Sequence, residues 1–156
     1  MTTTQDPARL SANNERMRTV IARTPFMKHL AMEFLDAGEG WAKLKMSYQD
    51  ENSTAFKALH GGAISSLIDT TGAMAAWTTA EIATPKYFGS TVGINVNYLF
   101  GVIGEDIFAE GRVLKRGKEI IYADVRVTNG AGKLLAQGTV VYRIVERAEE
   151  SRPGTA

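Results

Sequence analysis

Residues 60–80 read HGGAISSLIDTTGAMAAWTTA, and the arrangement of the whole chain follows from this segment. Its apolar residues recur at the spacing of a helix, so it predicts one long and largely buried helix. Asp69 is the only formally charged residue between Lys57 and Glu81. A carboxylate in an apolar helix is costly unless it is paired or hydrogen-bonded, so Asp69 is a candidate site residue.

The two sides of this predicted helix carry side chains of different size. One side carries the larger residues, which are Ile64, Leu67, Ile68, Thr71, Met74 and Ala75. The other side is made almost wholly of small residues, which are Gly62, Ser65, Asp69, Gly72, Ala73 and Ala76. Small side chains let another backbone approach closely, so we expect apolar cover on the first side and room for a ligand or a partner on the second.

Strand-like segments lie before and after the helix. Residues 30–47 alternate around a turn at 36–40, which predicts a hairpin. Four more alternating runs follow the helix, at 90–100, 105–115, 119–128 and 133–145. Turn residues at 116–118 and 129–130 join the last three runs, so we expect consecutive antiparallel pairing.

The first of these runs bears on the site. Its apolar residues are Val92, Ile94, Val96 and Tyr98. Its polar or small residues are Thr91, Gly93, Asn95 and Asn97. Strict alternation therefore places Thr91 on the polar face of this strand.

One long helix and one large antiparallel sheet predict an α+β protein in which the sheet wraps around the helix, the hot-dog arrangement. At 156 residues the chain has room for a single domain. We expect an N-terminal extension at 1–25 with a short helix at 13–24 that Pro25 ends, the main domain at 26–146 and a disordered tail at 147–156.

Composition limits the partners. The formal net charge is +1, which gives no broad basic field for nucleic acid. Cysteine is absent, which excludes disulfides, thiolate zinc sites and a cysteine nucleophile, and the two histidines, His29 and His60, have no metal-ligand spacing. The start of the chain lacks the pattern of a secretory signal, and residues 58–80 are too polar for a membrane span. We expect a cytoplasmic protein without a metal.

The string LHGGAISSLID at residues 59–69 resembles the signature of hot-dog acyl-CoA thioesterases of the phenylacetyl-CoA thioesterase-like group. The resemblance covers about residues 26–145 and continues at 90–99, 104–106 and 114–118. The triplet His-Gly-Gly alone is weak evidence, but an aspartate nine residues after the histidine makes the pattern fairly specific.

The resemblance implies hydrolysis of an acyl-CoA at a site shared by two subunits of a homo-oligomer, a dimer or a tetramer, with coenzyme A only as part of the substrate. It implies that the Gly61 N–H holds the oxyanion, that Asp69 is the general base or the nucleophile, and that Thr91 orients water. His60 is expected to bind the ligand or to brace the loop, and Gly62 is expected beside the substrate.

Five further residues follow from the same resemblance. Arg116 and Lys118 match a basic turn that contacts CoA phosphates in relatives. Many relatives have an amide residue six positions before the histidine and a glycine three positions before it, whereas this chain has Thr54 and Lys57 there. Thr54, or Asn52 nearby, is expected to take the place of that amide in substrate binding.

Structural alternatives remain open for these residues. Asp69 could bond to Ser65 or Ser66, His60 could be a structural histidine at a helix start, Thr91 an ordinary strand residue and the basic turn a solvated one. Three other functions also remain: a non-catalytic acyl-CoA or lipid-binding protein, a hot-dog enoyl-CoA hydratase or dehydratase, and a structural interaction protein.

Overall fold

The computed structural model describes residues 7–80 and 87–146. The helices are α1 (Pro7–Arg23), α2 (Pro25–His29), the 3-10 turn η1 (Asp50–Asn52) and α3 (Gly61–Trp77). The strands are β1 (Met32–Gly38), β2 (Trp41–Met46), β3 (Tyr87–Tyr98), β4 (Ile107–Arg116), β5 (Ile120–Asn129) and β6 (Leu134–Glu146). Every predicted strand is present within a few residues of its expected bounds.

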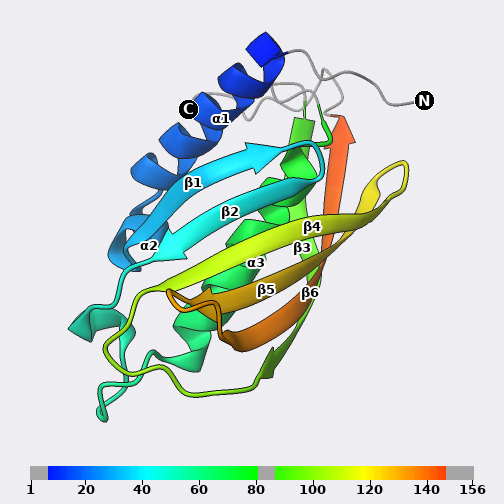
Figure 1. Cartoon of the computed structure of the whole chain (residues 1–156). Helices are drawn as coiled ribbons and strands as arrows, with labels where there is room; N and C mark the ends of the chain where they lie inside the picture. Colours follow the sequence, from blue (N-terminus) through cyan, green and yellow to red (C-terminus); the bar gives the residue numbers. More distant parts are fainter. Residues whose placement is uncertain (1–6, 81–86, 147–156) are drawn as a thin grey trace, which may run out of the picture.

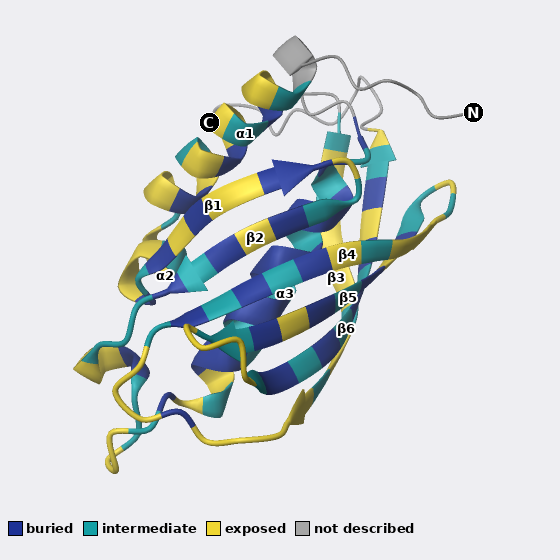
Figure 2. Ribbon diagram, in the orientation of Figure 1, coloured by how far each residue is buried: buried dark blue, intermediate teal, exposed yellow. Residues whose placement is uncertain are grey.

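The six strands form one antiparallel sheet in the order β1-β2-β4-β5-β6-β3, and the sheet curves around α3 (Figure 1). Strand β5 buries alternate residues from Ile121 to Val127, and the residues between them face away from the helix (Figure 2). The predicted α+β hot-dog arrangement is therefore confirmed.

Consecutive pairing is confirmed for β1 with β2 and along β4, β5 and β6, but it is wrong for β3. Strand β2 pairs with β4, and β3 pairs with β6 at the far edge of the sheet. The reason is that α3, which follows β2 in the chain, crosses the concave face of the sheet. Strand β3 therefore begins at the opposite side of the sheet. The result is a twelve-residue strand, β3, at the edge of the sheet, where β6 is its one partner among the strands that the structure describes.

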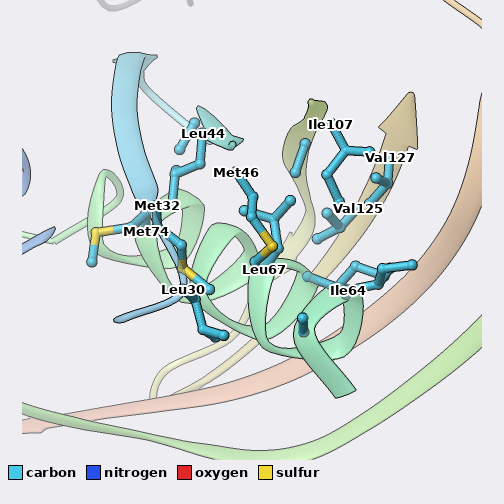
Figure 3. Close-up of a cluster of buried hydrophobic side chains, with 14 of the residues drawn as sticks. Leu30, Met32, Leu44, Met46, Ile64, Leu67, Met74, Ile107, Val125 and Val127 are labelled. Atoms are coloured by element: carbon cyan, nitrogen blue, oxygen red, sulfur yellow. The ribbon is translucent and has the colours of Figure 1, made fainter. Parts of the chain in front are cut away.

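The core lies between α3 and the sheet. Leu67 and Ile68 of α3 are both 0% exposed, and Leu67 packs among Met46, Ile107 and Val125 from three strands (Figure 3). Full burial of such a side chain contributes about 1.5–3 kcal/mol, so this cluster fixes the helix on the sheet.

The open side of α3 is narrower than the sequence predicts. Gly72 and Ala76, expected on that side, are buried. A Cβ atom at Gly72 would lie 2.6 Å from the Val140 side chain, because α3 packs directly against β6 there. The part of α3 that stays accessible carries Gly62, Ser65, Ser66, Asp69 and Ala73.

The N-terminal helix is longer than predicted and belongs to the same core. It begins at Pro7 and ends before Pro25, and its Met17 and Ile21 are each 2% exposed. Among the described residues, no helix is long and apolar enough to cross a membrane. The predicted tail at 147–156 and the loop around Pro85 lie outside the described residues.

Candidate active site

The Asp69 carboxylate has a defined partner on the neighbouring strand. The Thr91 hydroxyl of β3 donates to Asp69 Oδ1 at 2.7 Å. Ser65 and Ser66, the alternative partners, bond elsewhere: Ser66 donates to the Gly62 carbonyl, and Ser65 contacts the Tyr98 hydroxyl. The structure therefore brings two of the predicted site residues together on the accessible side of α3.

A bulge in β3 makes this contact possible. Thr91 pairs with Tyr142 and Gly93 pairs with Val141, so Val92 is the extra residue without a partner on β6. An extra residue shifts the alternation by one position, which places Thr91 on the same face as Ile94 and toward α3. Strict alternation, which placed Thr91 on the other face, is wrong at this position.

His60 caps the start of α3. It has an extended backbone with φ −69° and ψ 136°, and its Nδ1 accepts a hydrogen bond from the Gly62 N–H at 2.9 Å. This bond satisfies one of the donors that every helix leaves unpaired at its start. The geometry supports the bracing role that the sequence left open for His60.

The Gly61 N–H is the first of α3 and has no acceptor among the hydrogen bonds of the described residues. Such a donor sits at the positive end of the helix dipole, so it can hold a developing oxyanion. A Cβ atom here would lie 3.5 Å from the Tyr98 ring, which is ordinary contact. Gly61 therefore offers an open donor, and Gly62 beside it uses its own N–H for the cap.

Tyr98 is a site residue that the sequence did not single out. Its hydroxyl donates to the Gly61 carbonyl at 3.0 Å and contacts the Ser65 hydroxyl. The alternating pattern only placed Tyr98 among the apolar residues of its strand. Two features could have indicated its role: Tyr98 is the last residue of β3, on the face toward the helix, and its hydroxyl needs a hydrogen-bond partner.

Asn52 is not available to a substrate. It is 2% exposed, and its amide nitrogen donates to the carbonyls of Ser47 at 2.9 Å and Leu30 at 3.3 Å. Its amide oxygen accepts from the Gln49 N–H at 3.1 Å. The expected role in substrate binding is therefore corrected, because both of its donors hold the loop before α3 in place.

The rest of that loop shows how the chain accommodates the missing glycine. Lys57 has a φ of +61°, in the left-handed region that favours glycine, and its ammonium pairs with Asp50 at 2.9 Å. The Lys57 N–H donates to the Thr54 carbonyl at 3.0 Å, and the Thr54 hydroxyl accepts from the Phe56 N–H at 3.3 Å. The loop thus keeps a glycine-like turn, with a hydroxyl in place of an amide.

The basic turn lies away from Gly61 of the same chain. The Arg116 Nη1 donates to the carbonyls of Gly117 at 2.7 Å and Lys118 at 3.1 Å. This turn is at the tip of the β4–β5 hairpin, which projects from the sheet on the side of the molecule where α3 ends, whereas Gly61 begins α3 at its opposite end (Figure 1). One chain therefore does not bring Arg116 and Lys118 to Gly61.

Tyr142 of β6 lies within the electrostatic influence of Asp69 and contacts Trp77 of α3. The Trp77 indole N–H donates to the Tyr142 oxygen at 3.1 Å, and the two rings meet edge to face at 6.4 Å. Burial raises the pKa of Tyr142, the bond from Trp77 opposes this, and the Asp69 charge raises the pKa further. Tyr142 thus stays a neutral phenol beside the carboxylate.

The sheet also has a hollow of about 410 Å³ on its outer face. It is lined by Leu35, Lys43, Leu44, Phe108, Ala109, Glu110, Arg126 and Thr128. These residues differ from all nine predicted site residues, so the candidate site and this hollow are separate.

Comparisons with known proteins agree on one family. The model of the thioesterase superfamily matches residues 56–136. Human acyl-coenzyme A thioesterase 13 is 37% identical over 106 residues, which are 67% of this chain and 73% of that protein. The crystal structure of zebrafish thioesterase superfamily member 2 is 32% identical, covers 86% of this chain and 96% of its own, and has a TM-score of 0.71. The Escherichia coli PaaI protein of the phenylacetic acid degradation operon, at 20% identity, shares the fold with a TM-score of 0.76 over 87% of this chain and 96% of its own.

Proposed function

The chain belongs to the thioesterase superfamily, and from this premise we propose that it hydrolyses short- or medium-chain or aryl acyl-CoA to the free acid and CoA at Asp69. The observation that carries the proposal is the Asp69 carboxylate on the accessible side of α3, held by Thr91 at 2.7 Å. A fixed carboxylate with few polar neighbours is the group that thioester hydrolysis needs as a base or a nucleophile.

The chemistry uses two groups. As a base, Asp69 takes a proton from a water whose oxygen attacks the thioester carbon, and the carbon–sulfur bond then breaks to release CoA. As a nucleophile, Asp69 attacks the same carbon and forms an anhydride that water cleaves. In both routes the Gly61 N–H stabilises the negative charge on the carbonyl oxygen. Thr91 holds the carboxylate, and its oxygen can also accept from the attacking water.

The distance between the two groups requires a second subunit. Gly61 and Asp69 are eight residues apart on α3, which separates them by about 12 Å along the helix axis. A thioester carbonyl that reacts with a carboxylate at about 3–3.5 Å cannot also reach a donor that far away. We infer that Asp69 of one subunit works with Gly61 of another.

Strand β3 is the surface that suits this pairing. Among the described strands it is an edge of the sheet, it lies beside α3, and its exposed apolar side chains include Val92 at 60% and Ile94 at 43%. A long apolar edge favours pairing with another strand, so we propose a dimer through β3 and a tetramer built from two such dimers. The same arrangement would let the Arg116 and Lys118 turn serve CoA phosphates in a site whose Gly61 belongs to the other subunit.

Two features of the proposal concern conditions. We propose that turnover needs no metal or cofactor, since the carboxylate and the helix N–H supply the required base and oxyanion donor. We also propose a cytoplasmic location, which fits a chain with no cysteine.

The test measures free thiol released by the purified chain from short-chain, medium-chain and aryl acyl-CoAs. We expect turnover with at least one of them, and a loss of about 10²- to 10⁴-fold in kcat for Asp69→Asn. Asp124→Asn, the same change on the outer face of β5, is the matched control and should keep full activity.

Other outcomes would favour other functions. Tight binding of an acyl-CoA in calorimetry without thiol release would identify a binding protein, a result to which the absent amide at Thr54 would contribute. Hydration of crotonyl-CoA without thiol release would identify a hydratase. Full activity in Asp69→Asn would refute the proposed mechanism.

A further inference from the structure

The peptide group between Gly61 and Gly62 is held at both of its polar atoms. Its N–H donates to His60 Nδ1 at 2.9 Å. Its carbonyl, which belongs to Gly61, accepts from the Tyr98 hydroxyl at 3.0 Å. The first hydrogen bond comes from His60, the residue that caps α3, and the second comes from Tyr98 on strand β3. We call these two hydrogen bonds the clamp.

The direction of each hydrogen bond follows from chemistry. The Gly61 carbonyl can only accept, so the single Tyr98 hydrogen goes to it, and the Ser65 hydroxyl must then donate to the Tyr98 oxygen. Ser66 instead donates to the Gly62 carbonyl four residues earlier, the usual choice for a helical serine. Tyr98 thus occupies the carbonyl that Ser65 would otherwise bind.

Two consecutive glycines make such a clamp necessary. Glycine has a wide range of backbone conformations, so an unsupported Gly61–Gly62 pair would let the first turn of α3 rotate. On the other side of Gly61, the His60 N–H donates to the Asn52 carbonyl at 2.9 Å. The Gly61 N–H itself belongs to the His60–Gly61 peptide, whose carbonyl accepts from two later N–H groups of α3 at 2.9 and 3.1 Å. Fixing the Gly61–Gly62 peptide as well limits rotation at Gly61 between two held peptide planes.

We propose that Tyr98 is a positioning residue for the oxyanion donor: its hydroxyl fixes the Gly61–Gly62 peptide, and this aims the Gly61 N–H at the thioester carbonyl. The inference rests on the proposed role of Gly61. Strand β3 then orients both halves of the chemistry, the carboxylate through Thr91 and the oxyanion donor through Tyr98, seven residues apart.

The test reads the thioester carbonyl directly. Asp69→Asn is used as a background in which substrate stays bound without turnover, and the infrared stretch of a ¹³C-labelled thioester carbonyl is compared free and bound. A donor aimed at the oxygen shifts this stretch to lower wavenumber, and we expect Tyr98→Phe to lose most of that shift. A purely structural role for Tyr98 would leave the stretch unchanged.

Kinetics give the second readout. In the otherwise wild-type chain, Tyr98→Phe should lower kcat by about ten- to a hundredfold with KM within about twofold, since a misaimed donor weakens the transition state, with its fuller oxygen charge, more than the bound substrate. Ser65→Ala should lower kcat less, because the bond from Tyr98 to Gly61 stays. Tyr122→Phe, on the outer face of β5 at 42% exposed, is the matched control and should change neither value.

The outcomes separate the two ideas. If the Asp69→Asn protein with Tyr98 intact shows no shift of the carbonyl stretch on binding, then Gly61 is not the oxyanion donor and the proposed mechanism fails. If the shift is present and survives Tyr98→Phe in a folded protein, only the inference about Tyr98 is overturned. A thermal unfolding curve for each variant establishes that it is folded. Should Tyr98→Phe unfold, Ser65→Ala, which removes the contact to the Tyr98 hydroxyl, should lose a smaller part of the shift, and an unchanged shift there would overturn the inference.

Discussion

Thr91 on β3 and Asp69 on α3 are joined by a 2.7 Å hydrogen bond that only a bulged strand can make. Val92 is the extra residue, and it turns the Thr91 side chain from the outer face of the sheet toward the helix. The bulge lies beside the proposed catalytic carboxylate, where its effect is to select which hydroxyl meets Asp69.

This relationship predicts different effects at neighbouring positions. Thr91→Val should lower kcat by about ten- to a hundredfold, because a hydrogen bond to a charged group is worth about 1.5–3 kcal/mol net and its loss frees the carboxylate to rotate. Thr91→Ser keeps the hydroxyl and should stay within about threefold of the wild type. Steady-state kinetics on one acyl-CoA measure both variants.

Ser90→Ala is the internal control for that prediction. In a strand without the bulge, Val92 and Ser90 would face α3 and Thr91 would face outward. A loss of activity in Ser90→Ala together with full activity in Thr91→Val would therefore show that the strand is regular in solution.

The bulge also shows where sequence reasoning stops. Alternation predicted the existence and length of β3 well, since its residues have a clear period of two. It could not predict a single inserted residue, because a slip of one position leaves the pattern on each side intact. Nor could it place β3 beside β6, since that neighbour is set by the passage of α3 across the sheet and not by local turn residues.

The site was predicted to different degrees for a related reason. The relative placement of Asp69 and the two glycines could be predicted because their spacing lies within one helix, where sequence separation fixes geometry. The loop-holding role of Asn52 and the contacts of Tyr98 could not be predicted, because they depend on which loop or strand packs against each residue. Lys57 adopts a positive φ that is typical of glycine, and a lysine in the sequence does not predict this conformation.

A proline can remove the Gly61 N–H without removing the helix. Proline is favoured at the first position of a helix, and His60 before it already has the extended conformation that proline requires. Gly61→Pro should therefore keep the fold and lower kcat by about 10²- to 10³-fold, the cost of one oxyanion donor. Kinetics and a thermal unfolding curve together check this.

Gly61→Ala is the companion variant. It keeps the N–H, and its Cβ would meet the Tyr98 ring at an ordinary 3.5 Å, so its kcat should lie well above that of the proline variant. Equal losses in the two variants would mean that bulk at this position matters and the N–H does not.

Asp106 gives a prediction for stability against pH. It pairs with Lys45 at 2.8 Å and accepts from the Tyr48 N–H at 2.9 Å, and these bonds, that from Lys45 first, lower the pKa of Asp106. A lowered folded pKa means stability that is complete above the ordinary carboxyl pKa of about 4 and is lost as the pH falls through the lower folded value. Urea midpoints should therefore differ between wild type and Asp106→Asn at about pH 7 and converge at about pH 2. A constant gap at both pH values would assign the effect to packing.

Mixing two inactive variants tests whether the site is shared. If Asp69 and Gly61 of different subunits form each site, a mixed dimer of Asp69→Asn with Gly61→Pro contains one intact site and one doubly altered site. After exchange in equal amounts, half of the dimers are mixed, so activity should return to about a quarter of the wild type. Because both variants are separately inactive, the recovered thiol release is read against a low background.

A second mixture of variants is the control for this experiment. Asp69→Asn mixed with Thr91→Val leaves no intact site, since Asp69 and Thr91 meet within one chain, so its activity should equal the mean of the two preparations. Recovery in the first mixture and not in the second would place the carboxylate and the oxyanion donor on different subunits. Because about 12 Å separates Gly61 from Asp69 along α3, failure of the first mixture in a protein shown to exchange subunits would require another donor near Asp69 in the same chain.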